Sequence, residues 1–159
     1  MTLAGFRIDD RLLHGQVVET WIDELRPRHV VVANARVVGD RITRELWEAA
    51  MPSGVTLEVV LVEAAPAAVV GAEGRVLLIV ESPADALVLV EAGVQPEAIT
   101  VGGLHHAGGK EKLLEFVWVD AAERAALRRL AAAGIALVAQ DVPRRHPRDL
   151  GALLEDAPR

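Results

Sequence analysis

The stretch LAGFRIDDRLLHGQVVETWIDEL, residues 3–25, predicts a strand, a loop and a helix in immediate succession. Leu3–Ile8 is a short apolar run typical of a buried strand, and the apolar residues of Gln16–Leu25 recur at helical spacing. Only the polar loop Asp9–Gly15 separates the two. A strand joined to a helix by so short a loop is the repeating unit of a parallel sheet covered by helices.

The rest of the chain repeats this alternation. Further strands are expected at His29–Ala33, Val55–Val62, Arg75–Val80, Ala98–Val101, Leu114–Val119 and Ile135–Val142. Helices are expected after Asp40, from Glu63, from Pro83 to Glu91 and from Ala121 to Ala133. The order predicts an α/β fold with an open, mostly parallel central sheet and helices on both faces. We expect one domain over residues 1–159, with 143–159 as a C-terminal tail that has room for one helical turn.

Composition restricts the class of protein. Hydrophobic residues make up 52% of the 159 residues and charged residues 25%, which is typical of a globular chain and not of a disordered one. Apolar runs such as Val76–Val80 fall far short of the roughly 20 residues that cross a bilayer. The chain has no cysteine and no secretory signal, so we expect a cytoplasmic location. A net charge of −6 argues against nucleic-acid binding.

The loop Asp9–Gly15 is the main candidate for an active-site loop, because ligands of open parallel sheets bind where the strands end. His14 precedes the expected helix start at Gln16, where backbone amides and the helix dipole attract an anion. Arg11 adds a planar guanidinium suited to phosphate oxygens, and Gly15 allows close approach of the backbone. A neutral imidazole can accept a phosphoryl group and pass it on. The alternative for His14 is a structural role as a helix cap.

Two pairs of residues suggest metal binding at first sight. Asp9 and Asp10 are neighbours on an extended chain, so their side chains point to opposite sides and one ion would not easily take both. We expect one of them to orient the loop and the other to contact Arg11 or His14. The pair His105–His106 has no Cys or carboxylate at ligand spacing, which favours anion binding or simple exposure over zinc. We therefore expect no metal and no cofactor.

The sequence Arg7-Ile8-Asp9-Asp10-Arg11-Leu12-Leu13-His14-Gly15-Gln16-Val17 closely resembles the phosphorylation-site signature of the mannose/fructose/sorbose-family IIB proteins of the sugar phosphotransferase system. The resemblance extends over nearly the whole chain. It includes Val31–Asn34, Val90–Val94, Val101–His105 and Asp141–Pro143.

This resemblance implies that His14 accepts a phosphoryl group from a phosphohistidine of a IIA partner and passes it to a sugar imported by the membrane subunits IIC and IID. The matching Arg11 would steady the phosphoryl group. The remaining positions expected to bind phosphate or support the loop are Asp9, Asp10, Gly15, Gln16, Asn34, Gly102, Gly103 and His105. The IIA donor is expected on a separate polypeptide, and IIC and IID would bring the protein to the membrane periphery. A homodimer is possible.

The sequence departs from the family pattern on loops near the expected site. Ala35-Arg36 stands where an acidic pair is common, Glu81-Ser82-Pro83 replaces an Asn-Pro entry, and His106 adds a second imidazole. These changes bear on the choice of partner and sugar. Two other functions are alternatives: a non-catalytic regulatory domain derived from a IIB fold, and a receiver-like module phosphorylated on Asp9 or Asp10. The second lacks the Lys and Thr of receiver proteins.

Overall fold

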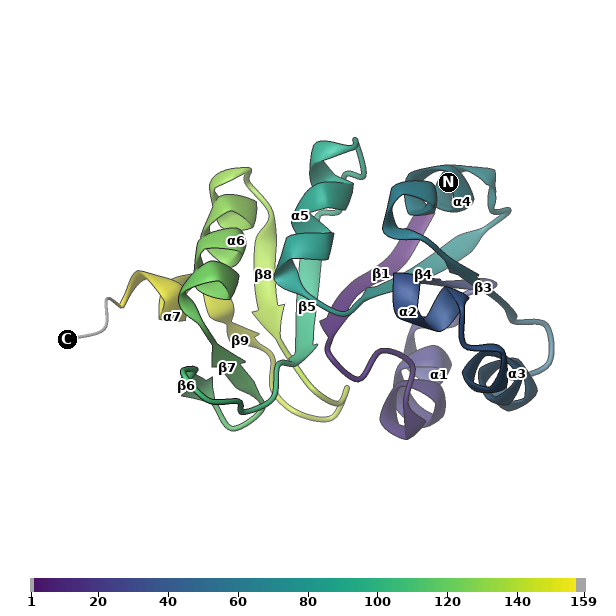
Figure 1. Cartoon of the computed structure of the whole chain (residues 1–159), viewed down its shortest axis with the longest axis horizontal. Coiled ribbons are helices and arrows are strands. Elements are labelled where there is room, and N and C mark those ends of the chain that lie inside the picture. The colour runs from purple at the N-terminus through teal and green to yellow at the C-terminus, as the bar shows by residue number, and fades with distance from the viewer. Residues whose placement is uncertain (1, 157–159) are drawn as a thin grey trace.

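A seven-stranded sheet forms the centre of the computed structural model, which describes residues 2–156 (Figure 1). The strands follow the order β3-β2-β4-β1-β5-β8-β9, and all neighbours are parallel except the β8–β9 pair. Their bounds are β1 Thr2–Asp9, β2 His29–Ala33, β3 Thr56–Val60, β4 Arg75–Val80, β5 Ala98–Gly103, β8 Ala136–Ala139 and β9 Arg148–Asp149. The predicted open, mostly parallel sheet is confirmed.

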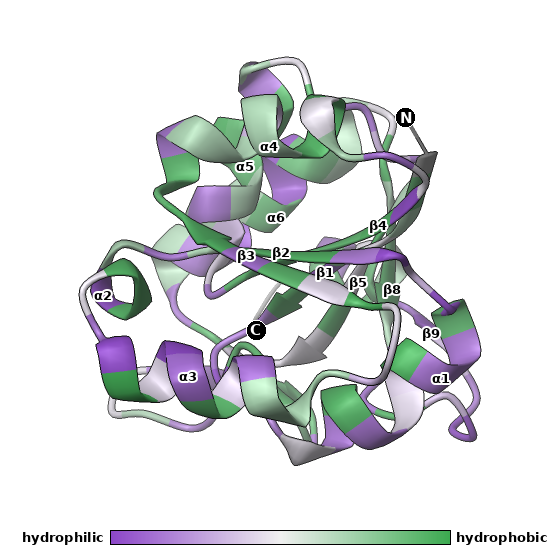
Figure 2. Ribbon diagram, turned by 90° about the vertical axis from the view of Figure 1, so that its right-hand side faces the viewer, coloured by the Kyte–Doolittle hydropathy of each residue, from purple (hydrophilic) through white to green (hydrophobic). Residues whose placement is uncertain are grey.

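Helices cover both faces of this sheet (Figure 2). One face carries the π-helix η1 Val17–Trp21, α1 Ile22–Leu25, α2 Ala35–Val38 and α3 Arg41–Ala50. The other carries α4 Ala65–Gly71, α5 Pro83–Glu91, α6 Ala121–Ala132 and α7 Leu150–Glu155, with the short 3-10 helix η2 Val62–Ala64 leading into α4. No helix within residues 2–156 is long and apolar enough to cross a membrane.

Alternation along the strands divides the buried apolar residues between these two faces. On β4, Val76, Leu78 and Val80 belong to the cluster under α4, α5, α6 and α7, whereas Leu77 and Ile79 belong to the cluster under η1 and α2. A strand buried on both faces is apolar at every position, which is why these runs were recognisable in the sequence.

Polar side chains fix where several helices begin. The side-chain oxygens of Asn34, Asp40, Ser82, Asp120 and Asp149 each accept a hydrogen bond from a backbone amide three residues later. Such caps satisfy amides that have no partner inside the helix. Three of these positions, Asp40, Ser82 and Asp120, were expected as helix starts. The cap at Asn34 adds the short helix α2, where the sequence predicted only a loop.

The strand predicted at Leu114–Val119 is wrong. The chain instead forms a hairpin of β6 Glu111–Leu114 and β7 Val117–Val119, which pair antiparallel in a separate sheet. A further parallel strand would need a crossover of about a dozen residues after β5. The chain between Gly103 and Glu111 is too short for one. The local hairpin satisfies the backbone hydrogen bonds without it.

The C-terminal segment, expected as a tail with room for one helical turn, contributes β9 and α7 to the fold, and residues 157–159 of it lie outside the described residues. Leu150 is fully buried and Leu154 retains 1% of its surface, both within the cluster under α6. Arg124 and Arg128 donate to the Leu154 carbonyl at 3.3 and 2.7 Å, which satisfies the last turn of α7. Helix α7 is therefore anchored by apolar burial and by two guanidinium groups.

Leu154→Ala is expected to lower the free energy of unfolding by about 2–5 kcal/mol, because it removes a buried side chain and leaves a cavity. Urea denaturation followed by circular dichroism measures the change. The control Val70→Ala changes a side chain that is 69% exposed and is expected to cost less than about 0.5 kcal/mol. Equal stabilities of the two variants would mean that α7 contributes little to the fold.

Candidate functional site

The loop after β1 is held in place by its own backbone and by two leucines. The Asp10 amide donates to the Gly103 carbonyl at 2.9 Å, and the Leu12 amide donates to the Asp9 carbonyl at 2.9 Å. Leu12 has φ 55, a left-handed conformation that is costly for a branched side chain. Burial of Leu12 and Leu13, at 1% and 2% exposure, offsets that cost. The loop is thereby pinned to the apolar cluster under η1.

Asp9 is the buried centre of the site. It has no exposed surface, and its Oδ2 lies 2.9 Å from His14 Nε2 and 3.3 Å from Arg7 Nη2. Its Oδ1 accepts from the Arg11 amide at 3.1 Å. Burial by itself would raise the pKa of Asp9, but the hydrogen bond with His14 and the charge of Arg7 outweigh it and hold the pKa below the usual 3.8. The carboxylate is therefore ionised at neutral pH.

His14 lies between this carboxylate and the surface. Its side chain is 17% exposed, and its carbonyl accepts from the amides of Val17 and Val18 at 2.9 and 3.1 Å as η1 begins. An ionised Asp9 can only accept, so a neutral His14 carries its proton on Nε2. Nδ1, which has no hydrogen-bond partner within residues 2–156, then holds the free lone pair.

Arg11 and the residues after His14 form the outer part of the site. The Arg11 side chain is 47% exposed, and its Nε lies 3.9 Å from Asp9 Oδ1. A Cβ at Gly15 would meet no atom within 4 Å, so open space adjoins the backbone there. Gln16 is exposed, and its carbonyl accepts from the Thr20 hydroxyl. This side of the loop is accessible and carries one half-exposed positive charge.

Asp10 points away from Asp9, as expected for neighbours on an extended chain. Its Oδ2 accepts a hydrogen bond from the His105 amide at 2.7 Å, and its Oδ1 lies 2.5 Å from His105 Nδ1. Beneath this contact, a Cβ at Gly103 would lie 3.0 Å from His105 Cε1 and 3.2 Å from Asp9 Oδ1. Asp10 therefore ties the loop after β5 to the loop after β1, and Gly103 allows the close approach.

Asn34 is not brought to His14. It lies at the end of β2, two strands from β1, where its Oδ1 caps α2 and its Nδ2 donates to Glu81 Oε2 at 2.8 Å. Arg36 Nη2 lies 3.3 Å from the same Glu81 oxygen. Two of the departures noted in the sequence, Arg36 and Glu81, are thus partners of each other. They form a separate polar cluster on the same edge of the sheet.

Arg7 is a site residue that the sequence analysis did not single out. It lies within β1, is 2% exposed and donates a hydrogen bond to Asp9. Its other partners are the carbonyls of Gln140 and Asp141, at 3.2 and 3.0 Å. Trp21 Nε1 donates to the same Asp141 carbonyl at 2.7 Å. The predicted strand Ile135–Val142 ends early because these carbonyls turn to Arg7 and Trp21. A lone charge inside the apolar first strand was the available signal.

Other chemistry considered for the site has little support in this geometry. No group of three or more His, Cys, Asp or Glu side chains in the part of the chain that the structure describes could hold a metal ion. His105 faces Asp10, whereas His106 packs edge-on against Trp118 at 4.6 Å between ring centroids. Asp9 has no exposed surface, so the phosphodonor of a receiver-like module could not reach it.

Comparison with known proteins gives consistent matches over most of the chain. The family model of the PTS system sorbose subfamily IIB component matches residues 3–158. The N-acetylgalactosamine-specific phosphotransferase enzyme IIB component 2 of Escherichia coli is 37% identical over 153 residues, covering 93% of this chain and 96% of that protein. The sorbose-specific EIIB component of Klebsiella pneumoniae is 34% identical over 140 residues, covering 86% and 84%. The crystal structure of the IIBSor domain of the Klebsiella pneumoniae sorbose permease has a TM-score of 0.90 at 30% identity over 99% of each chain.

Fold and sequence together define a component of a sugar phosphotransferase system. The chain belongs to the sorbose subfamily of IIB components, within the mannose family whose signature the sequence resembled. It is accordingly a phosphocarrier subunit, a class of transferase. IIB components of this family work with a IIA partner and with IIC and IID subunits.

The contribution of Asp9 to stability is expected to depend on pH. Asp9→Asn should lower the free energy of unfolding by about 3–5 kcal/mol at neutral pH, because it leaves the buried Arg7 cation without its carboxylate. The folded pKa of Asp9 lies below its ordinary value of 3.8, so the stabilisation is complete above about pH 4 and is lost as the pH falls through the folded pKa.

The difference in stability between wild type and Asp9→Asn should therefore shrink as the pH is lowered from about 5 towards 3. Urea denaturation at a series of pH values measures this difference. Asp23→Asn, at an exposed position of α1, provides the control and should change stability by less than about 0.5 kcal/mol. A difference that widens on acidification would contradict the ion pair.

Proposed function

We propose that His14 carries the phosphoryl group of this IIB component, bonded to Nδ1. The observation that supports this assignment is the 2.9 Å contact between His14 Nε2 and Asp9, which occupies one ring nitrogen and leaves the other with its lone pair. The ring is partly exposed, so a donor can approach it. No other histidine of the described chain combines a buried carboxylate partner with a position at the end of the central strand β1.

The transfer needs no movement of a proton. As Nδ1 of His14 bonds to phosphorus, the bond between phosphorus and the donor's imidazole nitrogen breaks, and the donor ring leaves in its neutral form. The His14 ring keeps the Nε2 proton and gains positive charge, which the Asp9 carboxylate opposes at 2.9 Å. The second transfer reverses this charge change when a sugar hydroxyl takes the phosphoryl group and releases a proton.

Arg11 is proposed to meet the charge of the phosphoryl oxygens in both transfers. Its guanidinium is half exposed and lies 3.9 Å from Asp9, so it can move onto an arriving phosphoryl group without breaking a short contact. The transition state of such a transfer is loose and spreads negative charge over the equatorial oxygens. A planar fork fits two of those oxygens at once.

The proposal implies a IIA phosphohistidine as the donor and an acceptor sugar held by IIC and IID at the cytoplasmic side of the membrane. Asp10, Gly103 and His105 support the loop from the neighbouring strand end, and Gly15 and Gln16 border the side from which a donor would arrive. The names of the relatives suggest a hexose or an amino sugar as the acceptor.

His14→Gln is expected to abolish phosphoryl labelling, because the variant has no nucleophilic ring nitrogen. The measurement is mass-spectrometric mapping of the labelled residue after incubation with phosphoenolpyruvate, the upstream carriers and a phosphorylated IIA protein. His29→Gln is the matched control, since His29 begins β2 at the opposite end of the sheet, and it should label as wild type. Persistent labelling of His14→Gln would refute the assignment.

Arg11→Lys is expected to slow labelling by about tenfold, which corresponds to about 1.4 kcal/mol in the barrier, because lysine keeps the charge but loses the fork. Stability should change little, since the side chain is half exposed. Rapid-quench measurement of the labelling rate tests this, with Arg41→Lys, at an 81% exposed position, as the control. Equal rates for the two variants would remove Arg11 from the proposed mechanism.

A further inference from the structure

The hydrogen bonds of Arg7 fix its guanidinium completely. Arg7 lies on the sheet face where the neighbouring strand β4 carries apolar side chains of the cluster under η1. Nη1 donates to Gln140 O at 3.2 Å, and Nη2 donates to Asp141 O at 3.0 Å. Nε and Nη2 also donate to Asp9 Oδ2, at 3.4 and 3.3 Å. All three nitrogens have partners, so the group cannot turn without breaking several bonds.

Gly102 has no side chain and so leaves space for the Arg7 guanidinium. We name this space beside Gly102 the Gly102 notch. A Cβ at Gly102 would collide with the guanidinium of Arg7. The β1–β5 pairing shifts register at this point, between the pairs Ile8–Val101 and Asp9–Gly103, and so leaves Gly102 unpaired in the register. The absence of a side chain here is a requirement of Arg7, because the three atoms nearest to such a Cβ all belong to the Arg7 guanidinium.

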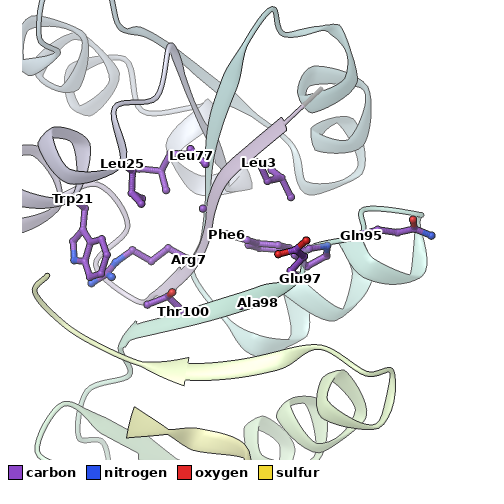
Figure 3. Close-up of a pocket in the computed structure, with 13 residues that line it drawn as sticks. Leu3, Phe6, Arg7, Trp21, Leu25, Leu77, Gln95, Glu97, Ala98 and Thr100 are labelled. Carbon is purple, nitrogen blue, oxygen red and sulfur yellow. The ribbon is translucent and has the colours of Figure 1, made fainter. Parts of the chain in front are cut away.

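Trp21 of η1 also contacts the Arg7 guanidinium. Its ring centroid lies 5.0 Å from Arg7 Cζ, within the range of a cation–π contact, and its Nε1 donates to the Asp141 carbonyl that Arg7 also uses. Figure 3 shows the Arg7 side chain extending towards Trp21 at one end of a pocket that β1, α1 and β5 line. Three separate segments, at Gly102, at Trp21 and at Gln140–Asp141, therefore hold one guanidinium against Asp9.

The Asp9 oxygen that Arg7 contacts is the one that contacts His14. Without a cation beside it, a fully buried carboxylate tends to take up a proton. A protonated Asp9 would donate to His14 Nε2, and the ring proton would then have to sit on Nδ1. In that arrangement the lone pair faces Asp9, and Nδ1 can no longer attack phosphorus. The charge and position of Arg7 thus select between two tautomers of His14.

We propose that Arg7, held in the Gly102 notch, is a positioning residue that fixes Asp9 so that His14 keeps its proton on Nε2 and presents Nδ1 to the donor. This inference rests on the function proposed above. Arg7 acts only through Asp9 and does not touch the phosphoryl group, since 2% of its surface is exposed. It therefore differs from Arg11, which lies at the surface.

Gly102→Ala tests the inference, because it fills the notch while Arg7, Asp9 and His14 stay unchanged. ¹⁵N NMR of the histidine rings is expected to show the Nε2–H tautomer of His14 in wild type and a large share of the Nδ1–H tautomer in the variant. Labelling by phosphorylated IIA should slow about tenfold or more, about 1.4 kcal/mol or more in the barrier.

Gly71→Ala is the matched control. A Cβ at Gly71 would meet no atom within 4 Å, and the residue lies in α4 on the opposite face of the sheet, so tautomer and rate should equal those of wild type. A folded Gly102→Ala protein with wild-type tautomer and rate would overturn the inference. An Nδ1–H tautomer in wild type would also overturn it, and this measurement requires no variant to fold. Both results leave the labelling test of His14→Gln untouched, and with it the proposal that His14 carries the phosphoryl group. An Nδ1–H tautomer in wild type would remove only the assignment of that group to Nδ1.

Discussion

The contact between His14 Nε2 and the buried Asp9 carboxylate is the interaction on which the rest of the site depends. A carboxylate without exposed surface stays ionised only beside positive charge, so Asp9 requires Arg7. Arg7 in turn requires two carbonyls beyond β8 and the Gly102 notch in β5. Because β1 lies between β4 and β5 inside the sheet, Arg7 and Asp9 keep only 2% and 0% of their surface exposed, and the ion pair between them is shielded from solvent.

Most of the fold could be predicted from the sequence because each strand of a doubly covered sheet is buried on both faces and reads as a continuous apolar run. The errors fall where this rule does not apply. The hairpin β6–β7 lies outside the sheet, and its turn at Glu115 and Phe116 contains no Gly, Pro or Asn to mark it in the sequence. The helix α7 has six residues, too few to form without tertiary contacts, and the burial of Leu150 and Leu154 that stabilises it is not visible in a local pattern.

The candidate site also has residues that the sequence predicts and residues that it does not. Asp9, Arg11 and His14 were recognisable because they are close in sequence, in a polar loop between a strand and a helix. Arg7 was not, since its partners Gln140 and Asp141 lie 133 and 134 residues further along the chain. The pairing of Arg36 with Glu81 was missed for the same reason: two separate departures from a pattern become one contact only when β2 and β4 are placed side by side.

The two-residue strand β9 has a consequence for how copies of the protein could associate. It pairs antiparallel with β8, follows Pro147 directly and leads at once into α7, so the sheet ends there in a segment too short and too crowded to recruit another strand. Growth of a continuous intermolecular sheet through this border is thereby blocked. Pairing of the central sheets of two copies has to use the opposite border, at β3.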